Sequence, residues 1–448
     1  MEPGTQIKSE NIEEIQIQEK KEIELKRRKK NNIRLYTPYK IVSWDLLFYY
    51  AIIYLFLVME KGISPAEAML FDAFYILFKF VMQIPCTLLI GKIGKRKSLL
   101  VANFTLAVHI LIIILAPNFN VLLISQVLCA FSYVIKATCE TDMLYDALEK
   151  GERRGSIFAK IDGRANSLYY YLDAITAIAS GFLFTVNAYI PMIACFICLM
   201  IAFFLSTKFE EVEEKKKQVT IIEEFKNLKI AFRNILKSKR LKNLLLFNGV
   251  FVALLRILQT LRNTSLTQIG MPEQYFGLIF AVLGIISGVA AKNQEKIHKK
   301  YRNKTLAFLS MPTAISCLII GLTLWIGAPN YITIPILFGL FAIQYIMKGP
   351  YYGLIKRYFN NFTNSEKRVK IATVNNLLEN LIAGIILFVT SAILDKVPVA
   401  YTLVLVGCVF VIAVVLLLDH MRTKVGLKPE EYRKKRITIN YEKNHKMV

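Results

Sequence analysis

Apolar residues in this chain gather into long runs that short polar segments separate. Each run is on the order of 20 residues, about the length that a helix needs to cross a hydrocarbon core of roughly 30 Å. The pattern therefore predicts an all-α integral membrane protein with 12 transmembrane helices. The predicted spans lie at about residues 41–60, 71–91, 98–116, 119–146, 165–186, 188–206, 241–261, 275–291, 305–327, 331–354, 371–394 and 398–418.

Composition agrees with this class, and the placement of charge adds an orientation. Hydrophobic residues make up 55% of the chain, which is too much for a water-soluble protein of this length. The net charge of +24 would suit a nucleic-acid partner, but 50 of the 57 Lys and Arg residues fall on one side of the predicted spans. The opposite loops contain only Lys61, Arg262 and Lys396. We therefore expect cytoplasmic termini, a plasma-membrane location, contact of the basic loops with anionic inner-leaflet lipids, and no nucleic-acid partner.

The longest internal polar segment divides the spans into six and six. We expect six-helix bundles at residues 41–206 and 241–418, joined by a cytoplasmic linker at residues 207–240. In the linker, apolar residues recur at helical spacing opposite basic ones, and Thr220 with Glu223 fits a capping box. This favours a basic amphipathic helix on the inner leaflet, with a calmodulin-type target peptide as the alternative. Residues 1–40 and 419–448 are predicted to be charged cytoplasmic tails, disordered or partly helical.

A short echo between the halves supports an internal repeat. The sequence KIGKR at Lys92–Arg96 follows the second span, and KIHKK at Lys296–Lys300 follows the eighth. Their matching location predicts two halves with the same architecture.

The segment QIPCTLLIGKIGKRKSLL, residues 83–100, resembles the loop signature between the second and third helices of the major facilitator superfamily. The residues that match it in kind are Ile84, Pro85, Leu89, Gly94, Lys95 and Arg96, while Gln83, Thr87 and Gly91 depart from it. The sequence LYDAL at Leu144–Leu148 is similar to the end of the fourth helix in bacterial, efflux-type members. The resemblance implies two pseudo-symmetric six-helix bundles around a central cavity. All helices except the third, sixth, ninth and twelfth would line it.

Charged side chains inside the predicted spans are candidates for function, because each costs about 2.5 to 3.5 kcal/mol near the bilayer centre. Away from the span ends they are Lys79, Lys136, Asp173, Arg256, Lys348 and Glu379, all on helices that would line the cavity. Four bases and two acids would suit an anionic or zwitterionic small-molecule substrate. The alternative is a structural role in which Lys348 pairs with Glu379. In the first bundle Asp173 would then pair with Lys136 or Lys79.

Asp173 and Glu379 are also the predicted proton carriers, because burial favours a neutral carboxyl and a moving base can favour its charged form again. Asp45, near the inner end of the first span, is a third candidate. The polar residues Gln259, Tyr345 and Asn376 lie close to these charges along their helices and are predicted to help shape the cavity. No cofactor is predicted, so the energy would come from a proton gradient or another ion gradient.

The loop after the second span is predicted to be a gating loop on the cytoplasmic side. Its residues are Gly91, Lys92, Gly94, Lys95 and Arg96, and it would act with Asp142 and Asp146, which lie four apart at the inner end of the fourth span. We expect one of these acids to pair with Lys92 or Arg96 as a latch between helices when the inner side is closed, with a solvated helix end as the alternative. At Gly91 the superfamily usually has an aspartate. Its absence predicts an outward-facing state that is held less firmly or by another contact.

The predicted function is proton-coupled efflux of a drug-like compound or metabolite by alternating access, with uptake of an anionic or zwitterionic nutrient as the alternative. A nucleotide site is excluded, because GKIGK lacks the spacing GxxxxGK followed by Ser or Thr. A membrane enzyme or a non-transporting receptor is less compatible with short outer loops and four unclustered histidines. CFIC at Cys195–Cys198 has metal-pair spacing, but its apolar span favours core packing and no metal site. We expect a monomer.

Overall fold

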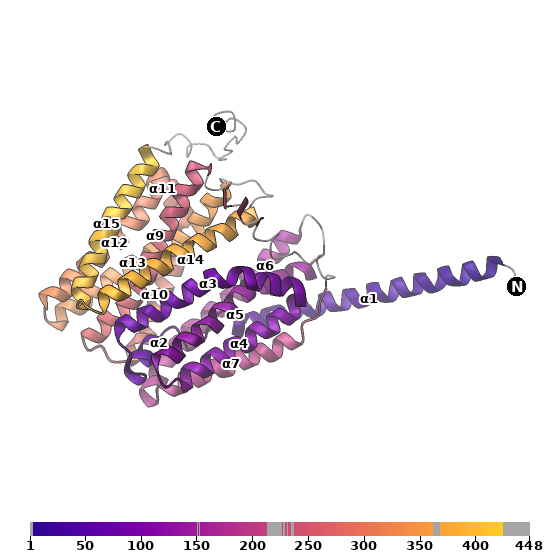
Figure 1. Cartoon of the computed structure of the whole chain (residues 1–448), viewed down its shortest axis with the longest axis horizontal. Helices are drawn as coiled ribbons and strands as arrows, with labels where there is room; N and C mark the ends of the chain where they lie inside the picture. The colour runs from indigo at the N-terminus through magenta and orange to yellow at the C-terminus, as the bar shows by residue number, and fades with distance from the viewer. Residues whose placement is uncertain are drawn as a thin grey trace.

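The computed structural model describes residues 3–149, 153–212, 237–361 and 368–423, together with isolated residues between these ranges. In this part of the chain, 11 helices are long and apolar enough to cross a membrane (Figure 1). They are α3 (Pro65–Ile93), α4 (Lys95–Leu115), α5 (Phe119–Ala147), α6 (Arg154–Val186), α7 (Tyr189–Thr207), α9 (Lys239–Gln268), α10 (Gln274–Lys292), α12 (Thr305–Ile326), α13 (Asn330–Asn361), α14 (Arg368–Leu394) and α15 (Val399–Thr423).

The first predicted span, residues 41–60, is not one continuous helix. Helix α1 (Pro3–Ser43) ends inside it, residues 44–52 are not helical, and α2 (Ile53–Leu55) with the π-turn η1 (Phe56–Glu60) completes the segment. Phe48 has a φ of 62°, which is uncommon for a bulky residue and marks the sharp change of direction. With this broken segment the chain has the twelve spans that the sequence predicts.

Helix α1 crosses the predicted boundary between the N-terminal tail and the first bundle. Residues 16 and 18–24 are exposed, as expected for a solvated arm. The last third is instead packed into the first half, where Asn32, Tyr36, Tyr39 and Lys40 are buried. The predicted linker helix falls mostly on residues outside the described ranges, and so does the C-terminal tail beyond residue 423.

Two halves are visible in the way the helices pack. In the first half, α4 packs against α5 and α7, α3 packs against α5, and α1 packs against α6. In the second half, α12 packs against α15 and α13, α9 against α14, and α10 against α13. The halves meet mainly along α3 with α14 and α6 with α10. The prediction of two six-helix bundles is therefore confirmed.

The two ends of this structure differ in charge. One end of the molecule carries the turn between α3 and α4, the segment after α7 and the short helix α11 (Gln294–Tyr301), and we name this end the basic face. The opposite face carries the short turns before α3, α5, α7, α10, α13 and α15. At the opposite face, Ser64 and Glu67 form a capping box that begins α3. At the basic face, Gly94 has a φ of 86°, a conformation that glycine adopts readily, and it joins α3 directly to α4.

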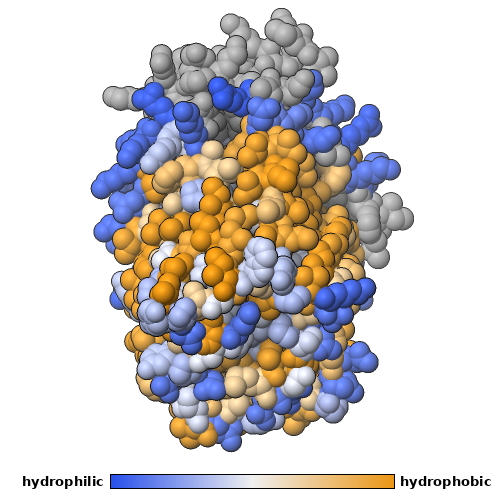
Figure 2. Space-filling model, turned by 90° about the vertical axis from the view of Figure 1, so that its left-hand side faces the viewer, coloured by the Kyte–Doolittle hydropathy of each residue, from blue (hydrophilic) through white to orange (hydrophobic). Residues whose placement is uncertain are grey.

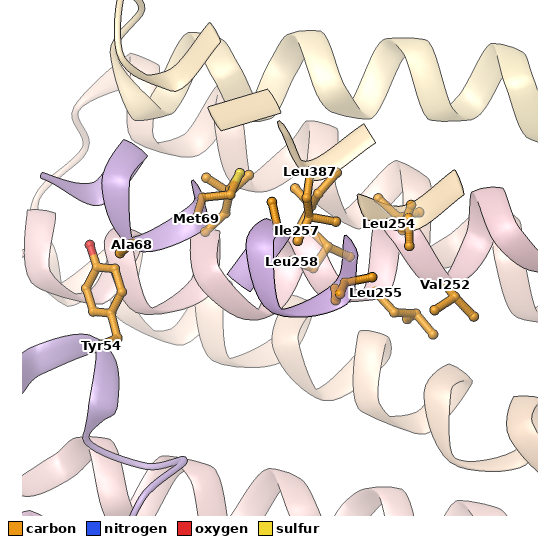
Figure 3. Packing of buried hydrophobic residues seen from close by; sticks show 14 of the residues in the cluster. Tyr54, Ala68, Met69, Val252, Leu254, Leu255, Ile257, Leu258 and Leu387 are labelled. Carbon is orange, nitrogen blue, oxygen red and sulfur yellow. The ribbon is translucent and has the colours of Figure 1, made fainter. Parts of the chain in front are cut away.

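Apolar packing joins the halves, and the outer surface is also apolar. Met69 of α3, Leu387 of α14 and several residues of α9, including Leu254 and Leu258, lie together in one buried cluster (Figure 3). On the exterior, large side chains such as Val186 and Ile326 are 76% exposed. Figure 2 shows hydrophobic residues across the middle of one view, with hydrophilic residues concentrated towards its borders. This surface fits a lipid environment.

Close contact between the halves is concentrated towards the opposite face. A Cβ atom placed on Gly277 of α10 would lie 2.0 Å from the carbonyl oxygen of Ala177 on α6, and one on Gly181 would lie 3.3 Å from the Gly277 nitrogen. The Ser391 hydroxyl of α14 donates a hydrogen bond of 2.7 Å to the Ala66 carbonyl of α3. Nearer the basic face, the remaining glycines of α6 and α10, residues 155, 163, 284 and 288, have nothing within 4 Å of such a Cβ. The halves are thus packed tightly at the opposite face.

Candidate functional site

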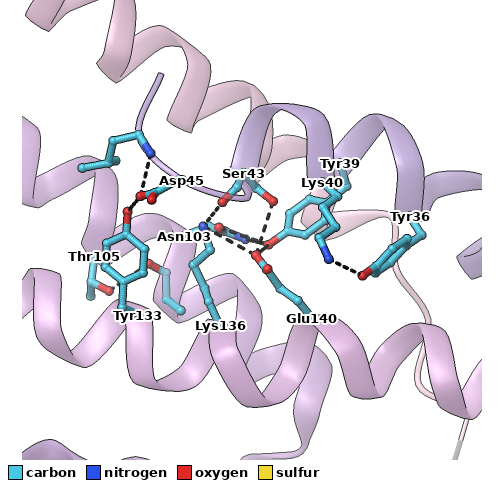
Figure 4. A network of polar contacts seen from close by, with 12 residues as sticks. Tyr36, Tyr39, Lys40, Ser43, Asp45, Asn103, Thr105, Tyr133, Lys136 and Glu140 are labelled. Atoms are coloured by element: carbon cyan, nitrogen blue, oxygen red, sulfur yellow. Dashed lines mark hydrogen bonds and ion pairs between the residues drawn. The ribbon is translucent and has the colours of Figure 1, made fainter. Parts of the chain in front are cut away.

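A carboxylate occupies the break in the first span. Asp45 Oδ1 accepts hydrogen bonds from the Leu46 amide at 3.0 Å, from the Tyr50 hydroxyl at 2.7 Å and from the Tyr133 hydroxyl of α5 (Figure 4). The two tyrosine oxygens are 3.2 Å apart. Asp45 thus accepts from the Leu46 amide, a backbone group that a continuous helix would have paired internally, while the two hydroxyls satisfy the carboxylate. Asp45 is therefore held by donors from the first span and from α5.

A buried ion pair lies next to the break. The Lys136 ammonium donates to the carbonyl of Ser43, where α1 ends, and lies 3.5 Å from Glu140 Oε1. The Tyr39 hydroxyl donates to the same Glu140 oxygen at 2.9 Å (Figure 4). The alternative pairing of Lys136 with Asp173 is wrong, because Glu140 lies one turn away on the same helix. Lys136 is a structural link between α5 and α1 in this state.

A second base of α1 is paired with α6. Lys40 forms an ion pair with Asp162, which also accepts a hydrogen bond of 2.6 Å from the Tyr36 hydroxyl. The Lys40 ammonium lies 4.1 Å from the Trp44 ring centroid. Sequence reasoning missed this cluster because it placed residues before 41 in a solvated tail. The signal was present, since Tyr36, Tyr39 and Lys40 recur at the spacing of one helix face.

Charged groups of both halves come together at the interface of α3, α9 and α14. Arg256 interacts electrostatically with Asp72 and Glu379, and Glu379 also interacts with Lys79. The Thr260 hydroxyl of α9 donates to Asp72 of α3 at 3.1 Å. Lys79, Arg256 and Glu379 were predicted from the sequence, whereas Asp72 was missed because it is the second residue of its predicted span.

Asp173 and Asp45 form the acidic side of this arrangement. The Asp173 carboxylate of α6 interacts electrostatically with Asp45 and contacts Tyr169, while Asp45 also interacts with Lys79. Both carboxylates are partly exposed. The structure thus connects Asp173 and Asp45 of the first half, through Lys79, with the Arg256 and Glu379 group.

The neutral side chains that hold Glu379 are not the ones predicted from the sequence. The Asn248 side-chain amide of α9 donates to Glu379 at 2.8 Å, and the Tyr351 hydroxyl of α13 donates to Asn248 at 2.9 Å. Gln259 is partly exposed on α9, and Asn376 is exposed on α14. Asn248, which sequence reasoning did not single out, holds the carboxylate directly.

The charge pattern predicted Arg262 to lie in an outer loop, and this prediction is wrong. It lies in α9, six residues before the helix ends, and is 4% exposed. Its guanidinium donates to the Tyr345 hydroxyl of α13 and to Asn263 Oδ1 at 3.0 and 3.2 Å. The Lys348 ammonium lies 5.1 Å from the centroid of the same Tyr345 ring. Lys348 and Arg262 therefore both lie next to the Tyr345 side chain. The alternative pairing of Lys348 with Glu379 is not seen among the described ion pairs.

The basic face carries an ion pair between α4 and α5, but with a different base from the expected ones. Lys95 lies 3.2 Å from Asp142 Oδ2 and forms a closer ion pair with Asp146. Arg96 instead donates to the Thr207 carbonyl at 2.9 Å. The pairing of these acids with Lys92 or Arg96 is thus wrong, because Lys95 is the base at the start of α4 that faces the end of α5.

The first amides of α4 are also capped. Glu211 accepts hydrogen bonds of 3.1 Å from the backbone nitrogens of Lys95 and Arg96. A carboxylate at a helix N-terminus satisfies unpaired amides and interacts favourably with the helix dipole. Lys92 is exposed, and a Cβ on Gly91 would have nothing within 4 Å. An acidic group therefore supports the α3–α4 turn even though Gly91 supplies none.

The segment that contains Glu211 is also bound by α1. Asn32 exchanges two hydrogen bonds with the Glu210 backbone, at 2.7 and 3.0 Å, and Arg27 lies 3.2 Å from the Glu210 carboxylate. On the same helix, the hydrogen bond and the charge of Arg28 lower the pKa of the exposed Glu24 carboxyl, which lies one turn before Arg28. Helix α1 thus fastens the chain after α7 to the basic face.

No group of three or more His, Cys, Asp or Glu in the described ranges is arranged to hold a metal ion. Cys195 is buried and Cys198 half-buried, and both are free thiols.

The fold is that of a membrane transporter. A family model described as the Major Facilitator Superfamily matches residues 41–327. The chain belongs to the Major Facilitator Superfamily.

Solved structures similar to this one are transporters with low sequence identity. The nucleoside transporter NupG is 12% identical, with a TM-score of 0.66 over 90% of this chain and 100% of that chain. A peptide transporter, POT, is 11% identical, with a TM-score of 0.64 over 91% of this chain and 95% of that chain. A POT family transporter in complex with 5-aminolevulinic acid is 12% identical, with a TM-score of 0.63 over 91% and 97%. No curated protein matches the chain in sequence.

Proposed function

We propose that this protein is a proton-coupled secondary transporter of a small polar solute with an anionic or zwitterionic character. The observation that carries the proposal is the meeting of Asp72, Lys79, Arg256 and Glu379 at the interface between the two halves. Charges at such a place are costly unless they pair, bind a solute or carry protons. In a transporter of two moving halves, they are positioned to change partners when the halves rearrange.

The described state supports an alternating-access cycle. The halves are packed together at the opposite face, and Lys95 with its two acids lies within the first half at the basic face. We assign the basic face to the cytoplasm of the plasma membrane, because the positive-inside rule favours that orientation and anionic lipids would meet its lysines. This state is then closed towards the outside.

Glu379 and Asp173 are the proposed proton carriers. Glu379 lies among Asn248, Arg256 and Lys79, so movement of the first half past the second would change the positive charge around it. Asp173 is partly exposed, so its carboxylate is accessible for taking up and releasing a proton.

The nature of the solute is proposed from the mixture of charges. Bases and acids of the interface would match a molecule with at least one charged group. The comparison structures include a nucleoside transporter and peptide transporters, and these names concern polar solutes. Efflux, suggested by the LYDAL resemblance, stays a prediction, because no feature of the interface favours one direction.

The test is transport by the purified protein in liposomes. Carboxylate-containing and zwitterionic metabolites, nucleosides, peptides and drug-like cations would first be ranked by their effect on thermal stability. The best compounds would then be assayed for flux with and without an imposed pH gradient. Flux that responds to the gradient supports the proposal, whereas flux at the same rate and to the same final level without the gradient contradicts proton coupling.

A further inference from the structure

Two basic side chains converge on one aromatic ring between α9 and α13. The Arg262 guanidinium carbon lies 5.6 Å from the Tyr345 ring centroid, and the Lys348 ammonium lies 5.1 Å from it. Arg262 also donates to the Tyr345 hydroxyl, so the ring and its oxygen are shared by both bases. Tyr345 and Lys348 are three residues apart, which places them on the same face of α13.

The positive charge of this cluster is not balanced by carboxylates. Within the described residues, the hydrogen-bond partners of Arg262 are the neutral oxygens of Asn263 and Tyr345. Lys348 interacts electrostatically with Tyr345, which favours the charged ammonium, and with Arg262 and Arg256, which are both positive. Neither Arg262 nor Lys348 belongs to an ion pair in the part of the chain that the structure describes.

The other bases inside the membrane region differ in this respect. Lys40 pairs with Asp162, Lys136 pairs with Glu140, Arg256 interacts with Asp72 and Glu379, and Lys79 interacts with Glu379 and Asp45. Among these described bases, Arg262 and Lys348 are therefore the pair whose positive charge has no acid beside it. A buried cation such as Arg262 is costly beside a second base that repels it, and a hydroxyl and an amide offset only part of that cost.

We propose that Arg262 and Lys348 form an anion subsite that takes a carboxylate or phosphate group of the transported solute. A guanidinium presents several donors in a plane and can bind two oxygens at once, while the lysine ammonium adds a second charge. Tyr345 is a positioning residue, because its ring lies near both bases and its hydroxyl accepts a hydrogen bond from Arg262. This inference rests on the proposed transport function and narrows the solute to one with an oxyanion.

The cluster is placed where a solute in the central interface can reach it. Tyr345 and Lys348 are partly exposed, although Arg262 itself is 4% exposed. Arg256 acts electrostatically on Lys348 and also on Glu379, which links the cluster to the charged interface. An oxyanion held by Lys348 would therefore lie near Arg256, on the basic side of the charged interface between the halves.

The test measures anion binding by the full-length protein in a neutral detergent. Sodium phosphate and sodium succinate are titrated against sodium chloride at equal ionic strength, with thermal stability and calorimetry as readouts. We expect phosphate or succinate to stabilise the wild type more than chloride does. Lys348→Gln should weaken this binding on the order of 10- to 100-fold, because it removes a charge-assisted contact.

Two further variants separate binding from folding. Lys356→Gln makes the same charge change on an exposed position of the same helix and should bind the anion as the wild type does. Tyr345→Phe keeps both bases, so it should weaken binding less than Lys348→Gln and spare the fold. Each variant is first checked for a wild-type elution volume and helical content.

The inference is overturned if neither anion exceeds chloride, or if Lys348→Gln and Lys356→Gln bind alike. It is also overturned if phosphatidylglycerol stabilises the protein in a Lys348-dependent way while the free anions do not, since the ligand would then be a lipid headgroup. Anion binding without proton-linked flux would contradict the proposed transport function alone. Proton-linked flux of a solute that has no oxyanion, with no anion binding, would contradict this inference alone.

Discussion

The contact between Gly277 and Ala177 gives a direct way to change the balance of states. In the variant Gly277→Ala the new Cβ would lie 2.0 Å from the Ala177 oxygen, whereas real Cβ contacts below 3.0 Å are essentially absent. The backbones of α6 and α10 must therefore separate by about 1 Å. Overpacking of this kind costs about 1–3 kcal/mol. Because the contact belongs to the state closed at the opposite face, the cost should fall on that state alone.

Such a cost shifts the equilibrium between the two states about 5- to 150-fold. The assay is a distance measurement between spin labels at Asn120 and Gln268, which are exposed on the first and second halves at the opposite face. The seven native cysteines are first replaced. We expect Gly277→Ala to move population towards longer distances and to slow any transport step that requires closure at this face.

Gly284→Ala is the matched control on the same helix. A Cβ there has nothing within 4 Å, so the variant gains helix propensity without a clash. Its distance distribution should equal that of the wild type. If Gly277→Ala also leaves the distances unchanged, the α6–α10 contact does not close the opposite face, and the reasoning is refuted.

The basic face provides the remaining local predictions. Lys95→Ala should lower the free energy of unfolding by about 1 kcal/mol, since the pair with Asp146 is mostly buried while Asp142 is nearly half exposed. Exchanging the charges of Lys95 and Asp146 should recover part of this loss in a denaturation experiment. A swap that recovers nothing would count against the latch. Glu211→Ala should cost about 0.5–2 kcal/mol by uncapping α4, seen as a lower melting temperature, and an unchanged melting temperature would argue against the cap. Gly91→Asp has space for its side chain and should favour closure of the basic face. The measurement is the distance between two labels at the basic face. Unchanged distances would show that residue 91 does not set the balance of states.

The sequence was sufficient for the architecture because membrane spans leave strong signals. Long apolar runs and the one-sided placement of basic residues depend on the bilayer and not on details of packing, so twelve spans in two bundles could be predicted. The break in the first span left no comparable signal. Apart from Asp45, residues 44–52 are apolar or aromatic, and the break depends on hydrogen bonds from Tyr133 and Lys136, which are distant in the sequence.

The sequence identified charged residues of the candidate site, but it did not show which of them interact with each other. Charges in the middle of apolar runs are visible in a sequence, so Lys79, Arg256 and Glu379 could be identified. Arg262 was misplaced because helix α9 continues to Gln268, beyond the point where the apolar run becomes polar. Partners depend on rotations of helices that hydropathy does not reveal. Lys95 was therefore not recognised as the latch base.

The central claim is that charges between the two halves couple solute movement to proton movement. The most direct measurement places the purified protein in liposomes that contain a pH-sensitive dye and imposes a solute gradient in place of a pH gradient. We predict that the solute gradient drives proton movement in the wild type, and that Glu379→Gln or Asp173→Asn abolishes this movement while the proteins still bind the solute. Solute-driven proton movement at the wild-type rate in Glu379→Gln and in Asp173→Asn would contradict the account.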